Sequence, residues 1–99
     1  MTVMRMIRPL DFTDYPMIPE RTQAALRRYV EQRLTPGGFL IAVLTNDLMG
    51  AISQADSDNI RVLRDICTFV YNNVPGDAWG NSDKVYAWSS DSLFDNVSR

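Results

Sequence analysis

Residues 35–50 read TPGGFLIAVLTNDLMG, and this stretch decides the fold. A Pro-Gly-Gly turn leads directly into an apolar segment that is interrupted only by Thr45, Asn46 and Asp47. Such a turn followed by a long apolar run predicts a tight corner and then a buried helix. We expect one helix over residues 39–54, and its apolar surface is wide enough to lie between two other helices.

Two amphipathic helices and a shorter one surround this stretch. The spacing of apolar residues predicts a helix over residues 19–34, with proline at its favoured first position, and another over residues 58–73, whose apolar stripe includes Cys67. Ser82 is expected to cap a short C-terminal helix that carries Trp88. Because no pair of segments has hairpin chemistry, the predicted fold class is all-α: a small helical domain of three main helices plus the short C-terminal helix.

The chain is expected to divide into three parts. Residues 1–17 contain two prolines and form a predicted extended N-terminal arm, residues 18–89 form the helical domain, and residues 90–99 form a loose C-terminal tail. The arm is either a disordered tail or a segment docked across a neighbouring subunit. Several aromatic residues lie outside the three main stripes, and a domain of 99 residues gains burial by self-association, so a homo-oligomer is expected.

Charge is distributed unevenly along the chain. The formal net charge is −2, yet residues 1–33 carry six arginines against four acids, while residues 34–99 carry four basic residues against eight acids. The overall acidity makes nucleic acid an unexpected partner. Nine of the ten basic residues are arginine, which is either the mark of a GC-rich genome or a preference for the guanidinium fork that binds phosphate.

Residue types that carry catalysis are scarce. Histidine is absent, which removes the commonest acid–base group, Ser-His and Cys-His nucleophiles and histidine-containing metal sites. We therefore predict no enzyme activity, no metal and no cofactor. The single Cys67 is interpreted as a small core residue in a reducing compartment. Without a membrane-length apolar run or a leader pattern, the expected location is the cytoplasm.

One stretch of the predicted corner has the properties of an anion site. Gly37 and Gly38 precede a helix and leave backbone N–H groups free at its positive end, and Arg33, Arg28 and Arg27 lie just before them in sequence. These five residues are predicted to bind a phosphorylated ligand. The alternative is a helix–helix corner that needs a residue in the left-handed conformation.

Aromatic residues provide candidate stacking surfaces. Trp79, Trp88 and Tyr29 are predicted to stack on a nucleobase, as flat rings do in nucleic-acid-binding proteins. The alternative is that the tryptophans close the core of a small domain. Asp47 either faces solvent or a neighbouring helix end, or forms a buried pair with an arginine.

Several short segments resemble a group of small phage and prophage proteins. The resemblance extends over residues 18–88 and rests on these segments: Ile18-Pro19-Glu20, Arg28-Tyr29-Val30, Pro36-Gly37-Gly38-Phe39-Leu40, Ala42-Val43-Leu44, Asn46-Asp47-Leu48, Ala55-Asp56, Tyr71-Asn72 and Trp79-Gly80. The group brings no established activity, so no functional residue is carried over. A phage origin implies a protein that acts by binding, and some small phage proteins sequester nucleotide signals of bacterial immunity.

Two functions from different classes follow. The first is a phage-encoded, oligomeric binding protein that captures a phosphorylated, cyclic nucleotide-type signal in the cytoplasm of the infected bacterium, as an anti-defence sponge. The second is a protein–protein adaptor or inhibitor of a host factor, which would use exposed apolar residues of the arm such as Met4, Met6, Phe12 and Met17. DNA binding through the arginine-rich first helix is a weaker third alternative.

Overall fold

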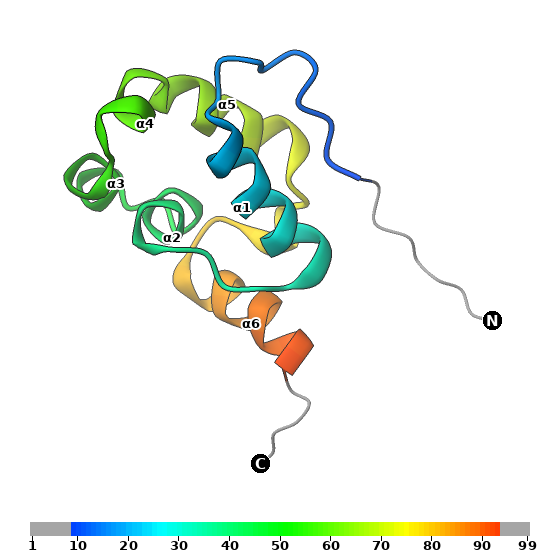
Figure 1. Ribbon diagram of the computed structural model, residues 1–99. Helices are drawn as coiled ribbons and strands as arrows, with labels where there is room; N and C mark the ends of the chain where they lie inside the picture. Colours follow the sequence, from blue (N-terminus) through cyan, green and yellow to red (C-terminus); the bar gives the residue numbers. More distant parts are fainter. Residues whose placement is uncertain (1–8, 94–99) are drawn as a thin grey trace.

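The computed structural model describes residues 9–93, with side chains as far as Ser89. Within these residues the chain forms six α-helices, one short 3-10 helix (η1) and no β-strand, which confirms the predicted all-α class (Figure 1). The elements are α1 Glu20–Gln32, α2 Gly38–Leu44, α3 Leu48–Gln54, α4 Ser57–Arg61, α5 Leu63–Asn73, η1 Gly76–Ala78 and α6 Ser82–Leu93. None of the described helices is long and apolar enough to cross a bilayer.

Helix α1 lies close to its predicted position but ends earlier. Pro19 is the residue before the first turn, and its carbonyl accepts hydrogen bonds from the backbone N–H groups of Thr22 and Gln23. The helix stops at Gln32 because Arg33 adopts the left-handed conformation, with φ of 63°. The corner therefore contains a left-handed residue, as the alternative expected, and this residue is Arg33, since Gly37 has φ of −74°.

The single helix predicted over residues 39–54 is also wrong, because the chain bends between α2 and α3. Asn46 has φ of 66°, a conformation that asparagine tolerates better than most residues, and its amide donates to the carbonyl of Gly80 at 3.1 Å. Asp47 then starts α3 by accepting the N–H of Gly50 at 2.9 Å. Polar residues inside an apolar run thus mark a break and a new N-cap.

The helix predicted over residues 58–73 is divided in the same way. Val62, with φ of −120°, separates α4 from α5. Asp56 caps α4 through the N–H of Asn59, and the buried side chain of Asn59 accepts the hydroxyl of Thr22 at 2.7 Å, which joins α4 to α1. Cys67 is exposed on α5, so its predicted place in the core is wrong.

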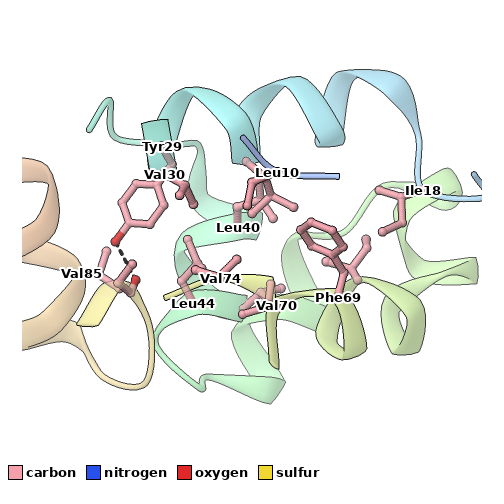
Figure 2. Packing of buried hydrophobic residues seen from close by; sticks show 14 of the residues in the cluster. Leu10, Ile18, Tyr29, Val30, Leu40, Leu44, Phe69, Val70, Val74 and Val85 are labelled. Carbon is pink, nitrogen blue, oxygen red and sulfur yellow. Dashed lines mark hydrogen bonds between the residues drawn. The ribbon is translucent and has the colours of Figure 1, made fainter. Parts of the chain in front are cut away.

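The segment before α1 belongs to the core of this chain. Leu10, Phe12 and Ile18 are buried, and the Phe12 ring stacks on Phe69 of α5 with ring centroids 4.1 Å apart. Figure 2 shows Leu10 beside Val30, and Ile18 beside Phe69. The described part of the predicted arm, from residue 9 onward, therefore packs on its own helices. Residues 1–8, which include Met4 and Met6, lie outside the described residues.

The C-terminal helix is longer than expected. Asn81, one residue before the predicted cap Ser82, accepts the backbone N–H of Lys84 at 2.9 Å. Helix α6 continues to Leu93, whereas the sequence predicted a loose tail after Ser89. Its residues Val85 and Trp88 enter the same core as α1, so α6 closes the domain on the side away from α3 and α4 (Figure 1).

Candidate functional site

Three of the predicted ligand-binding residues meet inside the domain. The indole N–H of Trp88 donates to the Tyr29 carbonyl at 3.0 Å. The Tyr29 hydroxyl, whose hydrogen bond is dashed in Figure 2, donates to the Ala78 carbonyl at 2.8 Å. Tyr29 is 0% exposed and Trp88 is 9% exposed. The guanidinium of Arg33 lies 3.7 Å from the centroid of the Trp88 ring and donates to the Trp88 carbonyl. These contacts hold α1, η1 and α6 together.

The other predicted arginines lie elsewhere. Arg27 faces the segment before α1, where its guanidinium sits 4.9 Å from the Phe12 ring and donates to the Leu10 carbonyl at 3.4 Å. Glu31, one turn along α1, accepts the Leu10 N–H at 3.1 Å. Arg28 is exposed on α1. Arg27 and Arg33 are thus engaged with different aromatic rings, so the structure does not bring these guanidinium groups to one point.

The predicted glycine pair lies at the start of α2, with Gly38 near the side chain of Gln54 at the end of α3. A side chain added at Gly38 would come within 2.6 Å of the Gln54 side chain of α3, whereas one added at Gly37 would meet nothing within 4 Å. Gln54 is exposed and the end of its side chain can move away, so packing requires neither glycine. Helix α2 has only seven residues, so its N-terminus offers a weak dipole for an anion.

Trp79 pairs with a ring outside the Tyr29 and Trp88 cluster. It is half-buried, and its ring meets the exposed Tyr71 ring of α5 edge to face, with centroids 5.9 Å apart. Tyr71 is 73% exposed and provides a flat surface, but no arginine is recorded beside this pair among the described residues. The three predicted stacking residues therefore do not form one ligand surface.

Burial of Tyr29 makes a testable prediction about alkaline pH. Desolvation raises the pKa of Tyr29 to about 12 from 10.0, and the positive charge of Arg33 opposes this shift only in part. The folded protein keeps the proton after the unfolded chain has lost it, so this contribution to stability is complete below pH 10 and is lost as the pH rises towards 12.

Urea unfolding of the wild type and Tyr29→Phe checks this expectation. The variant leaves the buried Ala78 carbonyl without its donor and is expected to cost about 1 to 3 kcal/mol near neutral pH. Because phenylalanine cannot titrate, the difference between the two proteins should shrink above pH 10. A difference that stays constant up to pH 11.5 would show that Tyr29 is not buried as described.

Asp47 has a structural role that leaves part of its carboxylate open. One oxygen, Oδ1, caps α3 through Gly50. The residue is exposed, and no arginine or lysine in the described part of the chain forms an ion pair with it, so the predicted alternative of a buried Arg–Asp47 pair is wrong. The other oxygen, Oδ2, has no recorded hydrogen bond to a described residue.

The cap predicts a graded response to substitution of Asp47. Asp47→Ala should lower the free energy of unfolding by about 1 kcal/mol, while Asp47→Asn, which retains a capping oxygen, should cost a few tenths. Equilibrium denaturation in urea measures both. Equal losses for the two variants would show that the charge, rather than the cap, holds α3.

The outer face of α3 is the feature that sequence reasoning missed. Leu48, Met49 and Ile52 are 60%, 74% and 46% exposed, and Ala51 is the one buried residue of the helix. Among the described elements, α2 is the one helix with extensive contacts to α3, which lies at the edge of the molecule (Figure 1). Large apolar side chains gathered at the surface of a domain commonly mark an interaction site.

A small hollow adjoins this face. It has a volume of about 90 Å³ and lies between α2, the start of α3 and Cys67 of α5, with Ala42, Val43, Asp47, Leu48 and Ala51 in its lining. Partial burial raises the pKa of the Cys67 thiol, although the residue as a whole is exposed. The sequence alone does not reveal this site, because a continuous helix over residues 39–54 would direct Leu48, Met49 and Ile52 to the core. The break at Asn46 leaves them exposed.

Other surfaces of the described residues give weaker support for a binding site. A larger apolar hollow of about 300 Å³ lies between α2 and α6 and includes Ile41, Val85 and Tyr86. The hydroxyls of Thr45 and Ser89 on its border already donate to backbone carbonyls. In the described residues no three acidic or cysteine side chains come together as a metal site would require.

Comparisons with protein-family models, with curated proteins and with solved structures find no match to this chain. The candidate site is therefore defined by its geometry: a neutral apolar helix face, Leu48, Met49 and Ile52 of α3, next to a small hollow bordered by the exposed carboxylate of Asp47.

Proposed function

We propose that this protein is a non-catalytic binding protein whose partner is another protein, and that the outer face of α3 receives this partner. The observation that carries the proposal is the exposure of Leu48, Met49 and Ile52 on a helix that buries only Ala51. Burial of apolar surface drives most protein association. If the resemblance to phage proteins holds, the partner is a host factor that the protein recruits or inhibits.

The energetics of α3 support this proposal. A seven-residue helix is far too short to be stable alone, and α3 is held by its Asp47 cap and by its packing on α2. Its three largest apolar side chains contribute little to the core of this chain. They become buried only when a second molecule covers them.

The geometry gives less support to capture of a phosphorylated nucleotide. Tyr29 and Trp88 are buried and hydrogen-bonded to backbone carbonyls, Arg33 already contacts Trp88, and Arg27 contacts Phe12. Calorimetric titration with cyclic dinucleotides and cyclic ADP-ribose isomers separates the two functions. The protein-binding proposal expects no heat of binding, and micromolar binding of any of these nucleotides would favour the nucleotide function instead.

Site-specific photo-cross-linking in the bacterial cytoplasm tests the protein-binding function. A photoreactive phenylalanine analogue replaces either Met49 or Tyr86, which are 74% and 75% exposed on α3 and α6. We expect a discrete adduct with one protein from position 49 and none from position 86. The adduct from position 49 should disappear when Leu48 and Ile52 are both changed to glutamine.

Two results would count against the proposal. Adducts of the same size from both positions would indicate non-specific collision, and no adduct from position 49 would leave the α3 face without a partner. The glutamine substitutions are at exposed positions and should change stability by no more than about 0.5 kcal/mol, so loss of the adduct would not reflect unfolding.

A further inference from the structure

Building on the proposed function, we propose that the occupant of the α3 face is an amphipathic helix of another protein that carries lysine or arginine beside its apolar stripe. One aliphatic side chain of that helix enters the hollow between Leu48 and Cys67, and a neighbouring cation pairs with Asp47. Helices that bind in this way present anchors at positions i, i+3 or i+4, and i+7.

The size and lining of the hollow identify the anchor. Its volume of 90 Å³ is about three times the volume of a water molecule in the liquid, which suits one aliphatic side chain. Ala42, Val43 and Ala51 line it with methyl groups. A pocket of this kind beside exposed apolar residues has the form of an interface hot spot, in which one anchor contributes much of the affinity.

The shape of the face favours a helix as the occupant. Leu48, Ile52 and Met49 lie within an arc of about 100° on α3, because each residue advances about 100° around a helix. They form a ridge rather than an extended edge, and the described residues offer no strand for β-sheet addition. A second helix packs on such a ridge by placing its own side chains on either side of it.

Charge complementarity specifies the sign of the charge that the partner carries beside its anchor. Helix α3 contains no charged residue, and Asp47 is the one charged residue that lines the hollow. Its carboxylate is exposed, and Oδ2 has no recorded partner among the described residues. A cation one helical turn from the anchor would neutralise this carboxylate, whereas an acid there would be repelled.

A second copy of this chain fits the face less well. The exposed parts of Leu48, Met49 and Ile52 amount to roughly 350 Å² on one molecule, within the range of functional surface patches. A symmetric pair would bring two Asp47 carboxylates together from the two hollows, and the lining of the hollows supplies no cation to neutralise them.

Nuclear magnetic resonance of the full chain with two synthetic peptides tests this proposal. Both are alanine-based helices of about 18 residues with leucines at i, i+3, i+4 and i+7, and the polar positions are lysine in one peptide and glutamate in the other. The lysine peptide is expected to shift the amides of Leu48, Met49, Ile52 and Cys67. Its affinity should exceed that of the glutamate peptide about tenfold at low salt.

A matched pair of variants isolates the role of Asp47. Asp47→Asn keeps the cap of α3 but removes the charge, so it should weaken binding of the lysine peptide about threefold. Asp83→Asn removes the same charge from exposed Asp83 on α6 and should leave binding unchanged. Equal effects of the two variants would reveal a response to net charge alone and would overturn the assignment.

The remaining outcomes separate this inference from the proposed function. If both peptides shift the α3 amides with equal affinity, the face binds helices but has no preference for cations, so the inference fails and the function stands. If neither peptide shifts them at about 1 mM, the inference and a helix-binding face fail together. Shifts at the same amides on concentrating the protein alone would assign the face to a second copy.

Discussion

Replacing Trp88 by alanine is expected to lower the free energy of unfolding by about 3 to 5 kcal/mol, which is the usual cost of deleting a buried aromatic side chain. The ring is 9% exposed, and its N–H satisfies the Tyr29 carbonyl inside the domain. The substitution also removes the surface on which the Arg33 guanidinium lies. Urea denaturation followed by circular dichroism measures the loss.

Trp79→Ala provides the matched control for this prediction. Trp79 is half-buried and contacts the exposed Tyr71, so its removal should cost about 1 to 2 kcal/mol, less than that of Trp88. If Trp88→Ala were as stable as the wild type, Trp88 would be a surface residue, as the nucleotide-binding hypothesis requires. The core described by Tyr29, Trp88 and Ala78 would then be wrong.

Replacing Phe12 by alanine is expected to cost about 3 to 4 kcal/mol, although this residue precedes the first helix. Phe12 is 5% exposed, stacks on Phe69 and lies under the guanidinium of Arg27. In a domain of this size, a loss of 3 kcal/mol corresponds to a fall in melting temperature of at least about 12 °C. Differential scanning calorimetry detects such a change directly.

Met17→Ala is the control within the same segment. Met17 is 45% exposed, so the alanine variant should melt within a few degrees of the wild type. If Phe12→Ala had the same melting temperature as the wild type, residues 9–17 would be a loose tail and would not belong to the core. Similar large losses for both variants would indicate that the whole segment is sensitive, rather than the buried ring.

The sequence predicts a helix correctly where the spacing of apolar residues and the residues at the helix ends indicate the same element. The stripe of α1 (Thr22, Leu26, Tyr29 and Val30) is visible in the sequence and is buried in the structure. The bend at Asn46 could not be predicted from period, because apolar residues continue on both sides of it. The bend depends on a contact with Gly80, which is distant in sequence and appears only when the chain is folded.

The candidate site was hidden for the same reason. A continuous helix over residues 39–54 would direct Leu48, Met49 and Ile52 to a core between two neighbours, whereas the break turns them outward. Conversely, the aromatic residues that looked available for a ligand are used to close a small domain. Whether each of these side chains is buried or exposed depends on its position in the fold rather than on its residue type.

Many residues of the segments on which the expected phage resemblance rests have structural roles here. Tyr29 joins α1 to η1, Asn46 and Gly80 hold the bend, and Asp47 and Asp56 cap α3 and α4. Residues with such roles support a fold without specifying a ligand. Met49 and Ile52, which belong to the surface that would select a partner, lie outside these segments.

Oxidative footprinting of the methionines in living cells tests the central claim most directly, because Met49 lies on the α3 face and Met17, also exposed, lies before α1. The account predicts that Met49 is oxidised readily in the purified protein and is protected in cells that contain the partner, while Met17 reacts equally in both. Equal oxidation of Met49 in cells and in the purified protein would contradict the claim that this face binds another protein.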